Sequence, residues 1–133
     1  MLVAGDDHDE PIADEVRGLV DGHVVLDRRL AQRGHFPPID VVASVSRLMA
    51  KLIDEPHAAA AAWARAQLAR YEEHRDLIVL GAYQAGRDLA VDAAVRAVPA
   101  LDQLLRQDRV EQAAQDDART RLIALAAAST SRR

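Results

Sequence analysis

The chain has 133 residues and carries 17 basic against 21 acidic side chains, which gives a formal net charge of −4 at pH 7. This balance argues against a general nucleic-acid coat protein, because such a protein needs a basic surface to neutralise phosphates. The absence of cysteine excludes disulfides, thiolate catalysis and cysteine-based zinc sites. No apolar run approaches the ~20 residues of a membrane span, and the N-terminus has no basic, apolar leader. The sequence therefore predicts a soluble, cytoplasmic protein.

Alanine occupies 27 positions, whereas only four residues are aromatic. Alanine favours helices because it loses no side-chain entropy in them. A short chain with so few large side chains builds only a modest core. The composition therefore predicts a mostly helical chain whose stability on its own is in question.

The first part of the chain is predicted to form short elements separated by loops. In chain order these are a strand at 2–4, an acidic loop at 5–10, a helix at 11–20, a buried strand at 23–26, a short helix at 28–32 capped by Asp27, and a mixed segment at 40–49. Residues 36–38, Phe-Pro-Pro, exclude regular structure because each proline restricts the residue before it.

From residue 57 onward the apolar residues follow a helical period. Helices are predicted at 58–74, at 91–105 and at 116–128, with a frayed tail at 129–133. The apolar stripe of the first of these helices comprises Ala61, Ala64, Leu68 and Tyr71. Pro99 interrupts the second, so we expect two helices there, or a second helix that begins at the proline.

Several kinds of site are not favoured by the residues. No phosphate-binding loop of the Gly-x-x-x-x-Gly-Lys-Ser/Thr type is present, and Lys51, the only lysine, has no glycine-rich context. The five histidines fit no metal-ligand spacing, and the acidic run at 6–10 lacks the glycine and terminal glutamate of a calcium loop. Ser44 and Ser46 have no histidine nearby and no Gly-x-Ser-x-Gly motif. We therefore predict no metal site and no hydrolase triad.

The segment 21–49 carries the two side chains best suited to a ligand. Phe36 is restrained by Pro37 and Pro38, so it forms a rigid aromatic surface on which a planar ring could stack. Arg47 offers a planar guanidinium group of the kind that binds phosphate. The residues alone favour the plainer alternative, in which Phe36 fills the core and Arg47 is solvated.

The order of residues in this segment resembles the ATPases that energise type III secretion. These are the flagellar export ATPase and its injectisome counterparts, which are related to the catalytic subunits of rotary ATP synthases. The resemblance is carried by residues 21–40, DGHVVLDRRLAQRGHFPPID, and by residues 44–47, SVSR. Residues 5–14 upstream and 71–83 downstream also resemble this family, and the likeness extends from residue 1 to about Gln107.

This resemblance implies a mostly α fold with one or two short strands. Residues 1–52 would be the C-terminal end of a RecA-like nucleotide-binding domain of the P-loop α/β class. Residues 53–128 would be a C-terminal helical bundle that faces export substrates and chaperones. The family's phosphate loop, catalytic glutamate and magnesium-binding aspartate lie upstream of the matched part. We therefore expect a fragment that uses ATP with Mg²⁺ only within the complete enzyme and is inactive alone.

The resemblance also assigns roles to particular residues. Arg47 matches the arginine finger, which acts in trans on the γ-phosphate in a neighbouring subunit's site. Phe36 matches an aromatic residue, usually tyrosine, that packs against adenine, and Pro37 matches the proline that fixes it. Pro38 stands where alanine is usual. Asp27 stands where serine is common, and it adds a negative charge near the subunit interface.

The implied partners are the other subunits of a homohexamer, secretion chaperones, export substrates, and the stalk and regulator proteins of the export apparatus. The implied location is the cytoplasm, with peripheral association at the inner-membrane export gate and without nucleic acid. The motifs do not distinguish flagellar from injectisome systems. An alternative of another class is a non-catalytic helical adaptor. An independent enzyme would require turnover by residues 1–133 alone.

Overall fold

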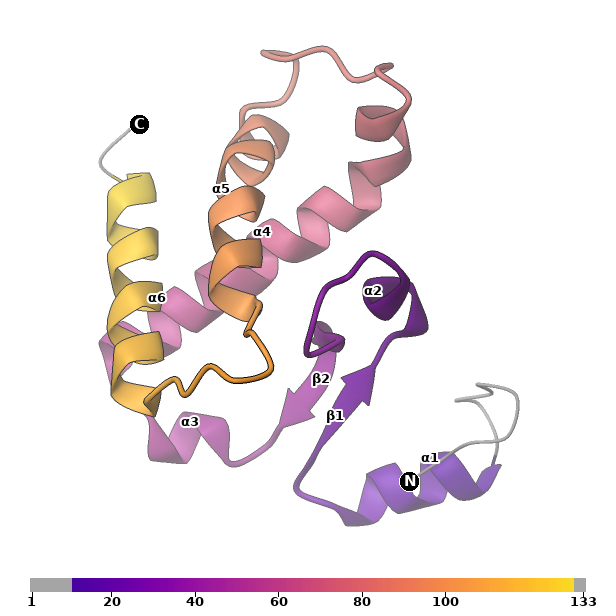
Figure 1. Cartoon of the computed structure of the whole chain (residues 1–133), viewed down its shortest axis with the longest axis vertical. Coiled ribbons are helices and arrows are strands. Elements are labelled where there is room, and N and C mark those ends of the chain that lie inside the picture. Colours follow the sequence, from indigo (N-terminus) through magenta and orange to yellow (C-terminus); the bar gives the residue numbers. More distant parts are fainter. Residues whose placement is uncertain (1–10, 131–133) are drawn as a thin grey trace.

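The computed structural model describes residues 11–130, so the predicted strand at 2–4, the acidic loop at 5–10 and the last three residues of the predicted tail lie outside the described part. The elements, shown in Figure 1, are α1 (Pro11–Leu19), β1 (Gly22–Leu26), α2 (Arg28–Gln32), β2 (Ile39–Ser46), α3 (Met49–Leu52), α4 (Glu55–Val79), α5 (Leu89–Leu105) and α6 (Gln115–Thr130). The prediction of a mostly helical chain with short strands is confirmed.

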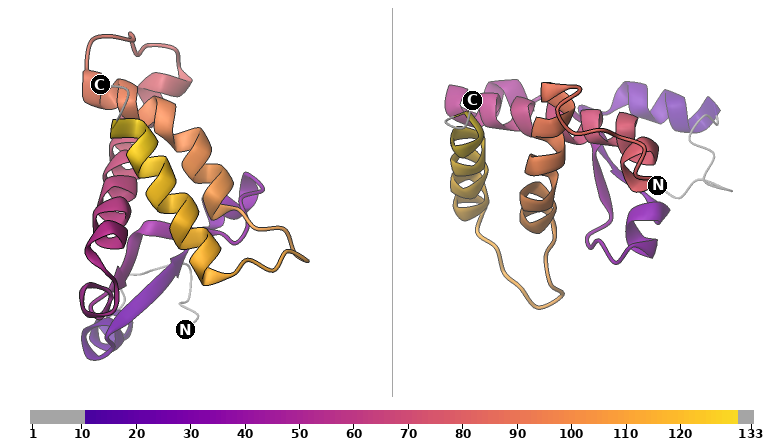
Figure 2. Two further views of the ribbon diagram at one scale, coloured as in Figure 1. Left: turned by 90° about the vertical axis from the view of Figure 1, so that its left-hand side faces the viewer. Right: turned by 90° about the horizontal axis from the view of Figure 1, so that it is seen from above.

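The three long helices pack together, and a small two-stranded sheet lies beside them. Helix α4 contacts both α5 and α6, which also contact each other, and Figure 2 shows these two helices lying against one side of α4. Helix α4 also contacts β2, so it connects the bundle to the sheet. None of the helices in the described range is long and apolar enough to cross a membrane.

The core lies between α4 and α5. Its buried apolar residues are Ala60, Ala64, Val91, Ala94, Val98 and Leu101. Most of these residues are small, which lets the two helices approach closely and explains how a chain poor in aromatic residues still packs. The buried line on α4 runs through residues 60, 64 and 67, so the predicted stripe is correct at Ala64 and half-buried elsewhere.

The prediction that Pro99 divides the helical segment at 91–105 is wrong. Helix α5 is continuous and contains Pro99 in its interior. Proline removes one helical hydrogen bond, a cost of about 3 kcal/mol. Pro99 is exposed, whereas Val98 and Leu101 beside it are buried against the bundle. Burial of that opposite face holds the backbone helical on both sides of the proline.

Two of the predicted helices are also too short. Helix α4 extends beyond 58–74 at both ends, because Asp54 caps its first turn and its apolar surface continues to Val79. Residues 129–130, predicted as frayed tail, belong to α6. The hydroxyl of Ser129 donates a hydrogen bond to the Ala126 carbonyl at 2.7 Å, which supports this last helical turn.

The sheet consists of β1 and β2 in antiparallel pairing. The strand predicted at 23–26 is present, but it is not buried, because Val24 and Leu26 are 66% and 62% exposed. Strand β2 falls in the segment predicted as mixed. Its register shifts between His23 and Val25 of the partner strand, so several β2 residues face a short stretch of β1. This bulge breaks the alternation that identifies strands.

A charged contact joins α6 to the start of α4. The Asp54 carboxylate accepts a hydrogen bond from the His57 amide at 3.2 Å and pairs with the guanidinium of Arg119. Partial desolvation acts to raise the pKa of Asp54, but the His57 amide and Arg119 stabilise the carboxylate more strongly. The net pKa therefore lies below the ordinary value for aspartate.

We predict that Asp54→Asn reduces the dependence of stability on acid. Asparagine still caps the helix, so the substitution mainly removes the charge. Because the pKa of Asp54 is lowered in the fold, its contribution is complete above the unfolded pKa near 4 and is lost as pH falls through the folded value. Thermal unfolding between pH 7 and pH 2 should show wild type and variant converging in acid. Asp76→Asn, at an exposed position on α4, is the control. A constant difference between wild type and Asp54→Asn would contradict the prediction.

Candidate functional site

The loop that carries Phe36 follows α2 directly. Gly34 ends that helix with φ near +70°, a conformation that favours glycine. The Phe36–Pro37 peptide bond is cis, and the Pro38 carbonyl accepts a hydrogen bond from the Asp27 amide at 2.9 Å. Phe36 is 53% exposed, so the interpretation that it fills the core is wrong. The loop holds an aromatic ring at the surface.

The end of α5 meets this loop. The Gln107 amide donates a hydrogen bond to the Phe36 carbonyl at 2.9 Å, which joins residues far apart in the sequence. Between them lies an open cavity of about 790 Å³. It is lined by Gly34, Phe36, Pro37, Arg106, Gln107, Asp108, Arg109 and Glu111. One wall of the cavity therefore comes from the loop after α2 and the other from the turn after α5.

The turn after α5 is fixed by its own polar contacts. The Gln107 side-chain amide donates to the Glu111 carbonyl at 2.9 Å, and the Glu111 carboxylate accepts from the Asp108 amide at 3.0 Å. The opposite wall presents the exposed ring of Phe36. A cavity with an aromatic surface on one side and charged and amide groups on the other suits a planar, polar ring.

Arg47 lies at the other end of the sheet. It directly follows β2, is exposed, and donates its main-chain amide to the Asp21 carbonyl at 2.8 Å. Its guanidinium Nη1 lies 3.4 Å from the Gly18 carbonyl at the end of α1. Ile39 and Ser46 pair with the two ends of β1, whose four residue steps of about 3.3 Å separate them by roughly 13 Å. The structure therefore brings Phe36 and Pro37 together but keeps Arg47 apart from them.

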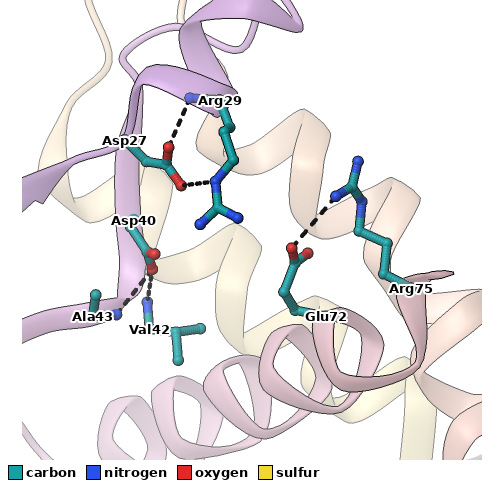
Figure 3. A network of polar contacts seen from close by, with 7 residues as sticks. All are labelled: Asp27, Arg29, Asp40, Val42, Ala43, Glu72 and Arg75. Carbon is teal, nitrogen blue, oxygen red and sulfur yellow. Dashed lines mark hydrogen bonds and ion pairs between the residues drawn. The ribbon is translucent and has the colours of Figure 1, made fainter.

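The bulge in β2 is held by side chains, as Figure 3 shows for Asp40. The Asp40 carboxylate accepts hydrogen bonds from the amides of Val42 and Ala43, both at 2.9 Å. The Ser44 hydroxyl donates to the Asp40 carbonyl and accepts from the Val25 amide. Ser44 thus has a structural role in the sheet, and Asp40 sets the path by which the chain reaches Arg47.

The charge of Asp27 is compensated locally. Its carboxylate caps α2 by accepting from the Arg29 amide at 2.7 Å, and it also lies 3.3 Å from Arg29 Nε. Figure 3 shows both contacts beside the separate Arg75–Glu72 pair on α4. The extra negative charge expected here is therefore neutralised within α2.

Sequence reasoning identified one wall of the cavity and missed the other. Arg106 and Gln107 received no role, because no motif marks them and their placement depends on where α5 ends. The Leu-Leu-Arg-Gln run at 104–107, at the limit of the family resemblance, was the available signal. Within residues 11–130, no group of three or more His, Asp or Glu side chains is arranged to hold a metal ion.

Comparison with known proteins identifies the family. The family model described as the T3SS EscN ATPase C-terminal domain matches residues 53–124, which is more than half of the chain. The chain belongs to the type III secretion ATPase family. A second model, the nucleotide-binding domain of the ATP synthase alpha/beta family, matches residues 1–46 of the chain.

The relatives of this chain include both flagellar and secretion-system ATPases. The chain is 44% identical over 127 residues to the flagellum-specific ATP synthase of Pseudomonas aeruginosa, covering 96% of this chain and 28% of that protein. It is 49% identical over 111 residues to the SPI-2 type 3 secretion system ATPase of Salmonella typhimurium, covering 84% and 26% of the two chains. The chain thus spans about a quarter of the length of these curated relatives.

Solved structures of the family share the fold. The assembled ATPase EscN from the enteropathogenic E. coli type III secretion system matches with a TM-score of 0.88 at 32% identity, over 95% of this chain and 31% of that chain. EscN in complex with its central stalk EscO matches with a TM-score of 0.80 at 34% identity, over 87% and 29%. An ATP synthase subunit, NeqB from Nanoarcheaum equitans, matches at 20% identity with a TM-score of 0.80, which shows a shared fold.

We predict that Gly22→Ala disturbs the strand pairing that positions Arg47. A Cβ atom at Gly22 would lie 2.6 Å from the Val45 carbonyl oxygen and 3.1 Å from the Ser46 Cα, so the backbone must shift. The variant should lose about 1–3 kcal/mol of unfolding free energy in urea.

Gly18→Ala is the matched control, because a Cβ at Gly18 in α1 meets nothing within 4 Å. That variant should be unchanged or gain up to about 1 kcal/mol from helix propensity. Equal stability of Gly22→Ala and wild type would contradict the close approach.

Proposed function

We propose that this chain is the C-terminal portion of an ATPase that drives type III protein export by ATP hydrolysis. The observation that carries the proposal is the cavity between Phe36 and Gln107, whose two walls are joined by the main-chain hydrogen bond between these residues. The cavity receives the adenine ring of ATP. The phosphates and Mg²⁺ would be held by a phosphate-binding loop, which the 133 residues do not contain, so the chain alone hydrolyses no ATP.

In this proposal Phe36 supplies the stacking surface for adenine, and Pro37 fixes its orientation. Phe36 lacks the hydroxyl of the tyrosine usual in the family, so recognition on this wall is by ring contact alone. The Gln107 side-chain amide and the charged groups of the facing turn provide the polar part of the pocket. Residues 1–52 act as the end of the nucleotide-binding domain, and residues 53–128 act as the helical domain. The two family-model matches support this division.

Arg47 is proposed to act as an arginine finger in a homohexamer. It is exposed and lies at the opposite end of the sheet from Phe36, and in this proposal it serves the nucleotide of a neighbouring subunit. Its guanidinium would stabilise the charge that develops on the γ-phosphate in a neighbouring subunit's site. The weak contact with the Gly18 carbonyl at 3.4 Å is easily exchanged for such a phosphate contact.

The proposed setting is the cytoplasm, at the periphery of the membrane export gate. The partners are other subunits of the ring, a stalk protein, chaperones and export substrates, with the helical domain facing incoming substrates. The match to the assembled EscN and to EscN bound to its stalk EscO supports assembly and a stalk partner. Coupling of hydrolysis to chaperone release and substrate unfolding completes the proposed cycle.

A chimera tests the proposed function. This chain replaces the matching 127-residue region of the Pseudomonas aeruginosa flagellum-specific ATP synthase, to which it is 44% identical. The chimera should assemble and hydrolyse ATP, and the 133-residue chain by itself should not. An assembled chimera without ATPase activity would contradict the proposal and favour a non-catalytic adaptor.

We predict that Arg47→Ala in the active chimera lowers kcat by about 10³-fold or more, because the transition-state charge loses its cationic partner. Arg96→Ala, which removes an exposed arginine on α5, is the control and should leave kcat unchanged. Steady-state hydrolysis and the mass of the assembly are measured together. Unchanged turnover in an intact ring would exclude the finger role.

Mixed rings test whether Arg47 acts in trans. Arg47→Ala subunits are combined with subunits whose phosphate-binding loop is disabled, so that neither type hydrolyses ATP alone. An interface that joins an intact loop to an intact Arg47 should then recover activity. Absence of recovery in verified mixed rings would show that both groups must reside in one subunit.

A further inference from the structure

His35 is buried beside the exposed Phe36. Its residue exposure is 5%, against 53% for Phe36. A histidine excluded from water is costly unless polar groups of the protein contact it. Its amide donates a hydrogen bond to the Leu30 carbonyl at 3.0 Å, which ties its backbone to α2. The main chain of His35 is therefore fixed to α2, next to the cavity wall that carries Phe36.

The imidazole of His35 contacts helix α5. Its Nδ1 lies 3.7 Å from Oδ1 of Asp102 on α5. This distance is beyond a good hydrogen bond, so the contact is an ion pair when the imidazole is protonated. The histidine side chain is 6% exposed, and the Asp102 side chain 44%. His35, between two residues of one cavity wall, thus contacts a carboxylate on α5, the helix that leads into the other wall.

Together with two main-chain hydrogen bonds, this contact forms a closed circuit that links the two walls of the cavity. The Asp102 carbonyl accepts a hydrogen bond from the Arg106 amide at 3.0 Å, and Arg106 precedes Gln107. The Gln107 amide in turn donates to the carbonyl of Phe36, which follows His35. Displacement of His35 relative to Asp102 would therefore change the spacing between Phe36 and Gln107.

We propose that His35 and Asp102 form a positioning pair that sets the separation of the two cavity walls. The pair touches no reacting atom and acts through Phe36 and Gln107. The inference that this pair affects catalysis rests on the proposed function of the cavity. The pair is expected to change one kinetic property and not the others. It controls affinity for the nucleotide base and leaves the phosphate contacts and the chemical step unchanged.

The first measurement uses the ligand-free 133-residue chain. Amide hydrogen exchange at Gln107 should quicken by about tenfold in His35→Leu and in Asp102→Asn, because the hydrogen bond to Phe36 opens more often. Asp76→Asn, also an aspartate on a bundle helix, should leave it unchanged. Asp102→Glu should restore most of the protection, since its longer side chain can span the 3.7 Å gap. Unaltered Gln107 exchange in folded His35→Leu and Asp102→Asn would overturn the proposal.

The second measurement uses the ATPase chimera. His35→Leu and Asp102→Asn should raise KM for ATP by about tenfold with kcat within about twofold, a split expected when binding contacts are lost. Inhibition by tripolyphosphate, which has no base, should keep its wild-type inhibition constant. A matching loss of tripolyphosphate inhibition, or a lowered kcat with unchanged KM, would indicate a general structural role and overturn the proposal. An inactive parent chimera would contradict the proposed function alone, since the exchange measurement decides the pair independently.

Discussion

A single main-chain hydrogen bond, from the Gln107 amide to the Phe36 carbonyl, joins the loop after α2 to the turn after α5. Both walls of the cavity depend on it, because the loop carries the aromatic ring and the turn carries the polar groups. The hydrogen bond from the Asp27 amide to the Pro38 carbonyl fixes the loop to the start of α2. The bundle core holds α5, and with it the turn, in place. The site therefore belongs to neither part of the chain alone.

The apolar side chains are buried in the helical bundle but largely exposed on the sheet. Small residues make a tight but thin core between α4 and α5, whereas the sheet leaves Val24 and Leu26 largely exposed. Sheets of α/β nucleotide-binding domains are normally covered on both faces. Under the proposed function, the exposed strands are the surface on which the remainder of the ATPase would pack. Arg47 lies beyond the end of this sheet and away from the cavity, and its proposed role toward a neighbouring subunit rests on this position together with its exposure.

Local signals predicted the elements whose determinants are local. Asp27 and Gly34 delimit α2 as expected, since a capping carboxylate and a glycine at positive φ act within a few residues. The interior position of Pro99 could not be predicted, because it depends on burial of the opposite face of α5 against α4. Strand β2 was missed for a related reason. Its bulge, held by Asp40, breaks the alternating pattern.

The residues of the candidate site also fall into two groups, those that could be predicted from the sequence and those that could not. Phe36 and Arg47 could be selected from sequence through a family resemblance, since each lies in a distinctive run of residues. Arg106, Gln107 and Asp102 could not, because their importance comes from contacts across the molecule. Whether Phe36 fills the core or presents a surface was likewise decided only by its 53% exposure.

The most direct test of adenine binding in this cavity uses the fact that Phe36 is the only phenylalanine in the chain. In the ATPase chimera, segmental labelling that confines ring-labelled phenylalanine to these 133 residues gives a single aromatic signal. ATP should shift that signal and produce magnetisation transfer between the Phe36 ring and the adenine protons, whereas tripolyphosphate should do neither. A Phe36 signal that stays unchanged at saturating ATP would show that the base binds elsewhere and would contradict this assignment of the cavity.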